Sequence, residues 1–238
     1  MKLPKVMLGS SPFIGAGQFG VKAFEYYWRF YQHPENIAEI AVHCWRLGVK
    51  AVQLLACEPL AKGILMAEKR IGEKFQVVGT LDPDDPLEAL KLYDGLEIVG
   101  LAFHASTSDL LDKELLTRLR DYIKRRIGCP VGAATHAPLR FLSWFRETEL
   151  ELDFVMVPFN VRGIFMDGKP EELVKLLREV GVKAVAKKVL AAGKLKPKEV
   201  LEYVAGFRDV VEGVALGITS KEEAEETMPL ALKLFECR

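Results

Sequence analysis

The chain has 238 residues, half of them hydrophobic, which suits a single α/β barrel with a large core. Lysine plus arginine and aspartate plus glutamate both number 33, so the formal net charge is zero, which argues against a general nucleic-acid binder with a basic face. No apolar run is long enough to cross a membrane and the N-terminus lacks a signal-peptide core, so we expect no membrane partner and no secretion.

Eight short apolar runs alternate with segments of helical spacing. The apolar runs predict β-strands over residues 5–8, 51–56, 76–81, 98–103, 131–135, 154–158, 184–189 and 213–218. The helical segments cover residues 34–47, 60–71, 86–93, 108–127, 139–147, 170–180, 197–207 and 220–235. Nearly continuous apolar runs are typical of parallel strands covered on both faces. Eight such units predict one domain over 1–238, a single (β/α)8 TIM barrel. The alternative is a doubly wound open sheet, but no GxGxxG motif follows an early strand.

The segment between the first strand and the first long helix is atypical. Residues 9–20 are rich in glycine, and six aromatic residues follow, Phe24, Tyr26, Tyr27, Trp28, Phe30 and Tyr31. The glycines permit a tight loop, so we expect this segment near the barrel mouth. We interpret the aromatic residues as a packing layer. The alternatives are a lid or stacking surface around a ligand, or a contact in a homo-oligomer.

Reactive side chains in a TIM barrel come from the C-terminal ends of the strands. His104 and His136 follow two neighbouring predicted strands, where each could act as a general acid or base, or hydrogen-bond the rim. Lys187 and Lys188 end the seventh strand, and only one of two adjacent residues can point into the barrel. We favour Lys188 as an anion ligand or Schiff-base amine. Asn160, after the sixth strand, is expected to orient a substrate.

A metal centre is a second interpretation of the same rim. His104 and His136, together with Asp82 or Glu58, could hold a divalent ion in a metal-dependent hydrolase. The competing interpretation of the acidic turn 82–86 is a helix start, with Asp84 or Asp85 as the N-cap before Pro86. We therefore expect no bound metal ion.

The last third of the chain predicts an anion site. The strands ending near residues 189 and 218 each run into a turn of small residues, and phosphate groups in TIM barrels usually bind at these two turns. The expected ligands are Ala192, Gly193, Thr219, Ser220 and Lys221. Ser220 can cap a helix whose first N–H groups would face the anion. The sequence thus predicts a small phosphorylated ligand.

Four stretches of the chain carry a remote resemblance to the aldo-keto reductase superfamily: Leu8-Gly9 with the loop to Gly20, then residues 157–160, 188–195 and 217–226. The resemblance implies a (β/α)8 barrel whose two C-terminal turns hold the phosphates of a nicotinamide cofactor, NAD or NADP. That family's catalytic residues are Asp, Tyr, Lys and His. The expected second-strand region, residues 52–63, has no tyrosine, and no lysine lies at 78–80. Only His104 falls where the family's histidine would.

These observations favour an enzyme of aldo-keto-reductase-like architecture that binds a phosphorylated ligand or nucleotide, and an oxidoreductase with a non-standard site follows from the resemblance. The alternatives are a lyase, isomerase or aldolase on a phosphorylated substrate, the metal-dependent hydrolase, and a non-catalytic binding protein that uses residues 24–31. Four widely spaced cysteines indicate a reduced, cytoplasmic protein. Two Asn and four Gln against 23 Glu suggest a thermophilic source.

Overall fold

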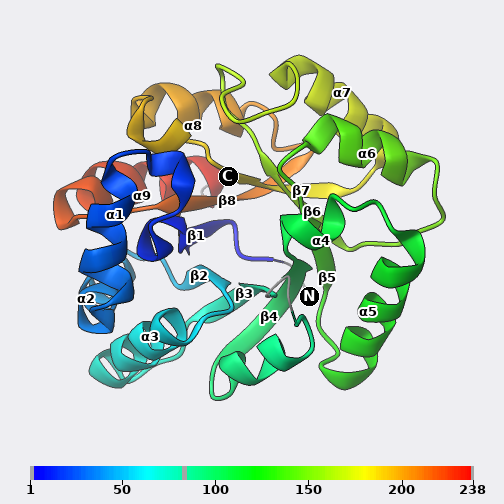
Figure 1. Ribbon diagram of the computed structural model, residues 1–238. Coiled ribbons are helices and arrows are strands. Elements are labelled where there is room, and N and C mark those ends of the chain that lie inside the picture. Colours follow the sequence, from blue (N-terminus) through cyan, green and yellow to red (C-terminus); the bar gives the residue numbers. More distant parts are fainter. Residues whose placement is uncertain (1–2, 82–84, 237–238) are drawn as a thin grey trace.

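Eight parallel strands close into a barrel in the order β1 to β8 (Figure 1). The computed structural model describes residues 3–81 and 85–236. The strands are β1 Val6–Gly9, β2 Ala51–Leu55, β3 Gln76–Thr80, β4 Glu97–Phe103, β5 Val131–Ala134, β6 Phe154–Pro158, β7 Lys183–Lys187 and β8 Val211–Gly217. β1 pairs with both β2 and β8, which completes the ring. The predicted TIM barrel is confirmed.

Helices surround the barrel, as the ring of coiled ribbons in Figure 1 shows. The α-helices are α1 Lys22–Tyr26, α2 Pro34–Arg46, α3 Glu58–Ile71, α4 Ala105–Ser108, α5 Lys113–Arg126, α6 Pro138–Arg146, α7 Pro170–Val180, α8 Pro197–Ala205 and α9 Lys221–Phe235. The 3₁₀ helices are η1 Ser11–Ile14, η2 Gly17–Phe19, η4 Glu88–Tyr93 and η5 Ala191–Gly193, and η3 Tyr27–Tyr31 is a π-helix. Among the described residues, none of these helices has the length and apolar character to span a membrane.

The helix predicted over 108–127 is observed as α5, but it begins later than predicted, because the chain breaks between α4 and α5. Leu111 has φ 59°, a left-handed conformation that interrupts a helix. Asp112 then starts α5 as its N-cap, accepting a hydrogen bond from the Leu115 amide at 2.9 Å. The break allows the short helix α4 to remain at the barrel rim.

Side chains alternate along each strand between the barrel interior and the helices. One apolar cluster lies between strands and helices, and a second, smaller cluster has members from all eight strands. The second cluster consists of Leu3, Met7, Ala51, Val78, Val99, Ala102, Ala134, Phe154, Met156, Val185 and Ala215. These residues fill the barrel interior, so space for a ligand remains only above them, at the C-terminal ends of the strands.

The aromatic segment is partly a packing layer, as predicted. Tyr26 and Phe30 are buried, and the Phe30 ring lies 5.0 Å from the ring of Phe13. Phe24 and Trp28 point away from this core and are 77% and 60% exposed. One side of the segment therefore anchors the loop 9–20 on the barrel, while the other faces outward.

Gly132 on β5 gives a test of the barrel packing. A methyl group added there would lie 2.5 Å from the carbonyl oxygen of Phe154 on β6, whereas one added at Gly17 meets nothing within 4 Å. We expect Gly132→Ala to lower the free energy of unfolding by about 1–3 kcal/mol, since the backbone must shift. Gly17→Ala should change it by less than about 1 kcal/mol. Urea denaturation measures both, and equal midpoints would contradict the packing described.

Candidate active site

Two joined cavities open at the C-terminal mouth of the barrel. The larger, here called the turn cavity, has a volume of about 250 Å³ and lies between α1, the β7–α8 turn and the start of α9. The smaller, the mouth cavity, has a volume of about 160 Å³ and lies over the barrel interior. Residues that line both are Ser11, Gln18, Gln53, Lys187 and Lys188. These shared residues form the neck between the cavities.

Polar residues form the top layer of the barrel interior, and the strand alternation places them there. Gln53 is two residues beyond the interior Ala51, and Thr80 is two beyond Val78. The Gln53 amide donates a hydrogen bond to the Thr80 hydroxyl at 2.9 Å. The sequence analysis missed both as site residues, although the two-residue period from the interior positions indicates them.

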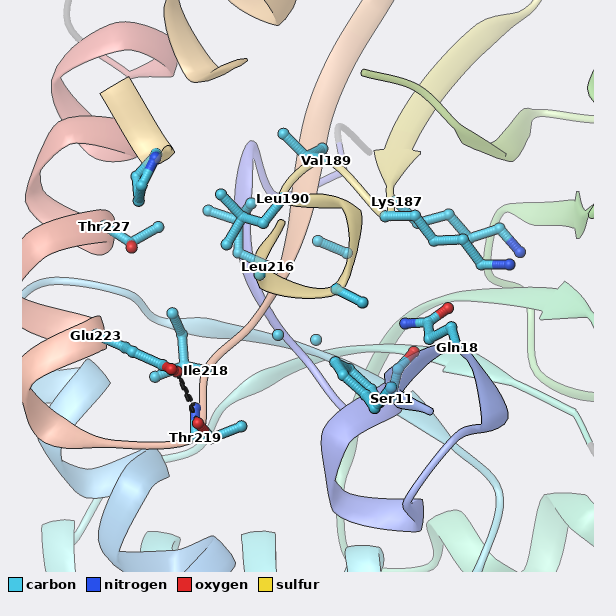
Figure 2. Close-up of a pocket in the computed structure, with 18 of the residues that line it drawn as sticks. Ser11, Gln18, Lys187, Val189, Leu190, Leu216, Ile218, Thr219, Glu223 and Thr227 are labelled. Atoms are coloured by element: carbon cyan, nitrogen blue, oxygen red, sulfur yellow. Dashed lines mark hydrogen bonds between the residues drawn. The ribbon is translucent and has the colours of Figure 1, made fainter. Parts of the chain in front are cut away.

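Lys187 points into the barrel, because it is two residues beyond the interior Val185 on β7. Burial, together with the charge of Lys188, lowers the pKa of its amine to about 7, although the charge of Asp109 opposes this shift. In Figure 2 its side chain leaves the end of β7 on the side away from Glu223 and Thr219. Near neutral pH the Lys187 amine is therefore available in its uncharged, nucleophilic form.

Lys188 lies just after the strand, and its side chain lines both cavities as well. Its φ of 55° is left-handed, which is uncommon for a residue with a side chain. Burial lowers the pKa of its amine, with Asp109 acting in the opposite direction. The two lysines thus share the mouth, whereas the sequence analysis favoured Lys188 alone.

Asn160 holds the backbone of Lys188 in place. Its side chain is fully buried and donates hydrogen bonds to the carbonyl oxygens of Ile164 at 2.9 Å and Lys188 at 3.3 Å. Its amide oxygen accepts from the N–H groups of Arg162 and Ile164. These bonds use the donors and acceptors of the amide. The geometry supports a positioning role for Asn160, not the substrate contact expected from sequence.

The two predicted histidines lie together at the mouth, with ring centroids 6.1 Å apart. Nδ1 of His104 accepts a hydrogen bond from the Ser106 amide at 3.1 Å, which assigns the ring proton to Nε2. Burial lowers the pKa of His136 to about 3, with the charges of Lys187, Lys188 and His104 adding to the effect. His136 is therefore neutral at neutral pH.

Asp109 supports this arrangement from behind and was not predicted as a site residue. Its carboxylate accepts hydrogen bonds from the Thr135 hydroxyl and from the His136 amide, the latter at 2.9 Å. The Thr135 hydroxyl in turn accepts from the Ala137 amide. The predicted continuous helix over 108–127 concealed Asp109, because the end of the separate helix α4 is what brings it to the rim.

Of the residues proposed for a metal centre, His104 and His136 lie together, but they do not form a metal site with other described residues. In the described parts of the chain, no group of three or more His, Cys, Asp or Glu side chains is arranged to hold a metal ion. Glu58 is exposed at the start of α3, close enough to Tyr31 for its charge to raise the pKa of that phenol. Asp82 lies outside the described residues. Asp85 accepts a hydrogen bond from the Glu88 amide at 3.0 Å, as a helix start would require.

The turn after β7 forms one wall of the turn cavity. Ala192 and Gly193 line this cavity, as the anion site requires. The turn is built from left-handed residues, with φ 59° at Ala192. The Ala191 amide donates to the Lys188 carbonyl oxygen and the Gly193 amide to the Leu190 carbonyl oxygen, both at 2.9 Å. These two N–H groups therefore stabilise the turn itself.

The turn after β8 already contacts a carboxylate of the chain. Glu223 accepts hydrogen bonds from the Thr219 amide at 2.7 Å and from the Thr219 hydroxyl at 2.8 Å (Figure 2). Ser220 caps α9 by accepting from the Glu223 amide, as predicted. Thr219 lines the turn cavity, but Ser220 and Lys221 are not part of its lining.

Several solved structures are similar to this chain. A Pseudomonas aeruginosa protein provisionally assigned as an aldo-keto reductase is 15% identical, with a TM-score of 0.68 over 98% of this chain and 92% of that one. An aldo-keto reductase of Brucella melitensis is 13% identical, with a TM-score of 0.66 over 96% and 89%. The chain has the fold of the aldo-keto reductases. A Bombyx mori aldo-keto reductase in complex with NADP is 14% identical, with a TM-score of 0.61 over 96% and 84%.

No protein-family model matches the sequence, and no curated protein matches it. The likeness to the aldo-keto reductases therefore rests on the fold, which agrees with the remote resemblance seen in the sequence. The chemistry must be argued from the residues at the mouth.

Asn160→Ala tests the positioning role. The change removes the acceptor of two partly buried N–H groups and the donor to two carbonyl oxygens, so we expect the free energy of unfolding to fall by about 1–3 kcal/mol. Asn36 is the matched control, because its side chain is half-buried and donates one hydrogen bond, to the Arg29 carbonyl oxygen. Asn36→Ala should cost less in the same urea titration. Equal losses would argue against the network at Asn160.

Lys187→Met tests the lowered lysine pKa. An unfolded lysine titrates near 10.5 and the folded Lys187 near 7, so between these values the unfolded chain binds more protons and wild-type stability rises with pH. The variant lacks this contribution. We expect its stability advantage over wild type to shrink as pH rises from 7.5 to about 10. Thermal unfolding of both proteins across this range measures the difference, and a constant difference would contradict the shift.

Proposed function

We propose that the chain is a carbon–carbon lyase that forms an imine between Lys187 and the carbonyl group of a small anionic substrate. The observation that carries the proposal is a lysine with a pKa of about 7 in a cavity at the barrel mouth. A lysine becomes a nucleophile when burial and a second cation lower its pKa, and both are present here. An aldolase reaction on an anionic sugar derivative is the form of this chemistry that we favour.

Each step can be assigned to residues of the chain. The neutral Lys187 amine attacks the carbonyl carbon, a C–N bond forms, and the C=O π pair moves to oxygen. That oxygen takes one proton from the attacking amine and one from the Lys188 ammonium, and leaves as water. The product is a protonated imine. His104 and the neutral His136 line the same cavity, and we assign them the role of hydrogen-bonding the oxygen while it carries charge.

The protonated imine then withdraws electrons from the substrate. The bond between its α and β carbons breaks, the electron pair forms an enamine, and the β-hydroxyl proton passes to the Lys188 amine. Protonation of the enamine and addition of water to the imine release the second product and regenerate Lys187. No oxidant or reductant is needed.

The charge of the mouth cavity supports an anionic substrate. Lys187 and Lys188 line it, and its described lining contains no acidic side chain. A carboxylate or phosphate next to the reacting carbonyl would lie beside the Lys188 ammonium. This places the anion at the lysines, while the turns after β7 and β8 form the other end of the site.

A nicotinamide-dependent oxidoreductase is the second candidate, which the fold favours. The residues do not fit its cofactor well. Glu223 already occupies the Thr219 N–H and hydroxyl groups that a cofactor phosphate would need, and the described lining of the mouth cavity includes no tyrosine as a proton donor. We therefore derive no step through such a cofactor.

Borohydride trapping with pyruvate tests the proposal. Reduction of the imine should leave a stable adduct on Lys187, located by peptide mass spectrometry, because pyruvate supplies a carbonyl next to a carboxylate. Lys187→Met should abolish the adduct. Lys183→Met is the matched control, since Lys183 is exposed at the opposite end of β7 and should leave trapping unchanged.

Two results would count against the lyase. One is labelling spread over surface lysines and unaffected by Lys187→Met. The other is tight binding of NADPH, seen by its fluorescence, with turnover of carbonyl compounds in a protein that gives no adduct. The second result would establish the oxidoreductase.

A further inference from the structure

The joined cavities carry opposite charges at their two ends. The mouth cavity holds Lys187 and Lys188 without a described acidic residue in its lining. The α9 end of the turn cavity holds Glu223 and Glu226, and Lys22 of α1 offsets one of these charges. A ligand that spans both cavities therefore meets the amines of Lys187 and Lys188 at the reacting end and a net negative charge at the other.

Glu223 disfavours a phosphate group at the α9 end of the turn cavity. Its carboxylate takes the Thr219 N–H and hydroxyl at 2.7 and 2.8 Å, and Ser220 binds the Glu223 amide at 3.2 Å. A phosphate at this turn would have to displace Glu223 and would also meet Glu226. Such an anion would lose its hydrogen-bond donors and be repelled by like charge. The turn that resembles a phosphate cradle is thus closed by the protein's own carboxylate.

Hydroxyl groups suit this end and the neck that leads to it. Carboxylates accept hydrogen bonds from sugar hydroxyls, as the acidic residue does on the ribose of dinucleotides. The neck is lined by Ser11, Gln18 and Gln53, which are neutral and can both donate and accept. A hydroxylated chain could extend from the mouth to α9 with a polar partner along its length.

We infer that the substrate is an unphosphorylated, sugar-derived 2-oxo acid, bound with its carboxylate and carbonyl at Lys187 and Lys188 and its hydroxylated tail at Glu223 and Glu226. This inference rests on the proposed lyase function for the identity of the carbonyl. It places the only anionic group at the mouth and assigns Glu223 as the residue that selects against a phosphate on the tail.

A matched pair of compounds tests the inference. The probes are 2-keto-3-deoxygluconate and its 6-phosphate, which differ only by a phosphate at the tail. Calorimetric binding to the wild-type protein should favour the unphosphorylated compound by at least about tenfold, the factor that ~1.4 kcal/mol of repulsion gives. Glu223→Gln and, separately, Glu226→Gln should each reduce this ratio by improving the affinity for the phosphate.

Two controls keep the outcome interpretable. Glu202→Gln changes an exposed residue of α8 outside both cavities and should leave the ratio unchanged. Glu226→Gln preserves the cap of α9, so it remains informative if Glu223→Gln fails to fold. A wild-type preference for the phosphorylated probe, equal affinities, or a ratio unmoved by both substitutions would overturn the inference.

The experiment separates this inference from the lyase proposal. Pyruvate lacks a tail, so its trapping on Lys187 tests the imine without the contacts at the α9 end. If pyruvate is trapped but the two probes bind equally, the tail assignment fails and the lyase stands. If no imine forms, the lyase fails, and with it the 2-oxo acid.

Discussion

The alternation of side chains in a closed parallel barrel is the constraint on which this site depends. The eight strands form a closed barrel in which the residues that point inward recur at every second position, apart from register shifts in the β3–β4 and β7–β8 pairs. Below the mouth these positions hold apolar side chains that fill the interior, and a ligand can bind only above them. The next inward position on β7 is Lys187, on β2 Gln53 and on β3 Thr80. Burial of the Lys187 ammonium against this apolar floor is what brings its pKa near neutrality.

The charges around Lys187 depend on structure that is itself held by buried polar groups. Asn160 bonds the carbonyl oxygen of Lys188 just where the backbone turns left-handed, so the second ammonium is kept at the mouth after the strand has ended. The charge of Asp109 opposes the lowering of the pKa of both lysines, and its carboxylate also accepts a hydrogen bond from the amide of His136. Asn160 and Asp109 thus affect both the backbone geometry and the charges at the mouth, and neither residue needs to contact a substrate.

The sequence predicted the barrel well because buried parallel strands are continuous apolar runs, and the observed strands differ from the predicted ones only near their ends. The sequence-based prediction failed where the structure depends on the backbone conformation of a single residue. Leu111 is a leucine in a left-handed conformation, and nothing in an apolar helical pattern marks it. Because this break was not predicted, Asp109 was not recognised as a residue of the barrel rim. The pattern Ser220-x-x-Glu223 is that of a capping box and signalled the Ser220 cap, but here the glutamate bonds Thr219, which only the structure reveals.

The turns after β7 and β8 show that the fold of this protein does not determine its chemistry. Small residues follow β7 and β8, and the surrounding barrel has the fold of the aldo-keto reductases. A backbone shape is an anion site only while its N–H groups face the ligand. At Thr219 they face Glu223, so the negative charge that the turn favours is provided from within the chain. The cations lie instead at the end of β7. The orientation that we propose for the ligand therefore follows from the positions of two glutamates and two lysines, and a likeness of fold does not determine it.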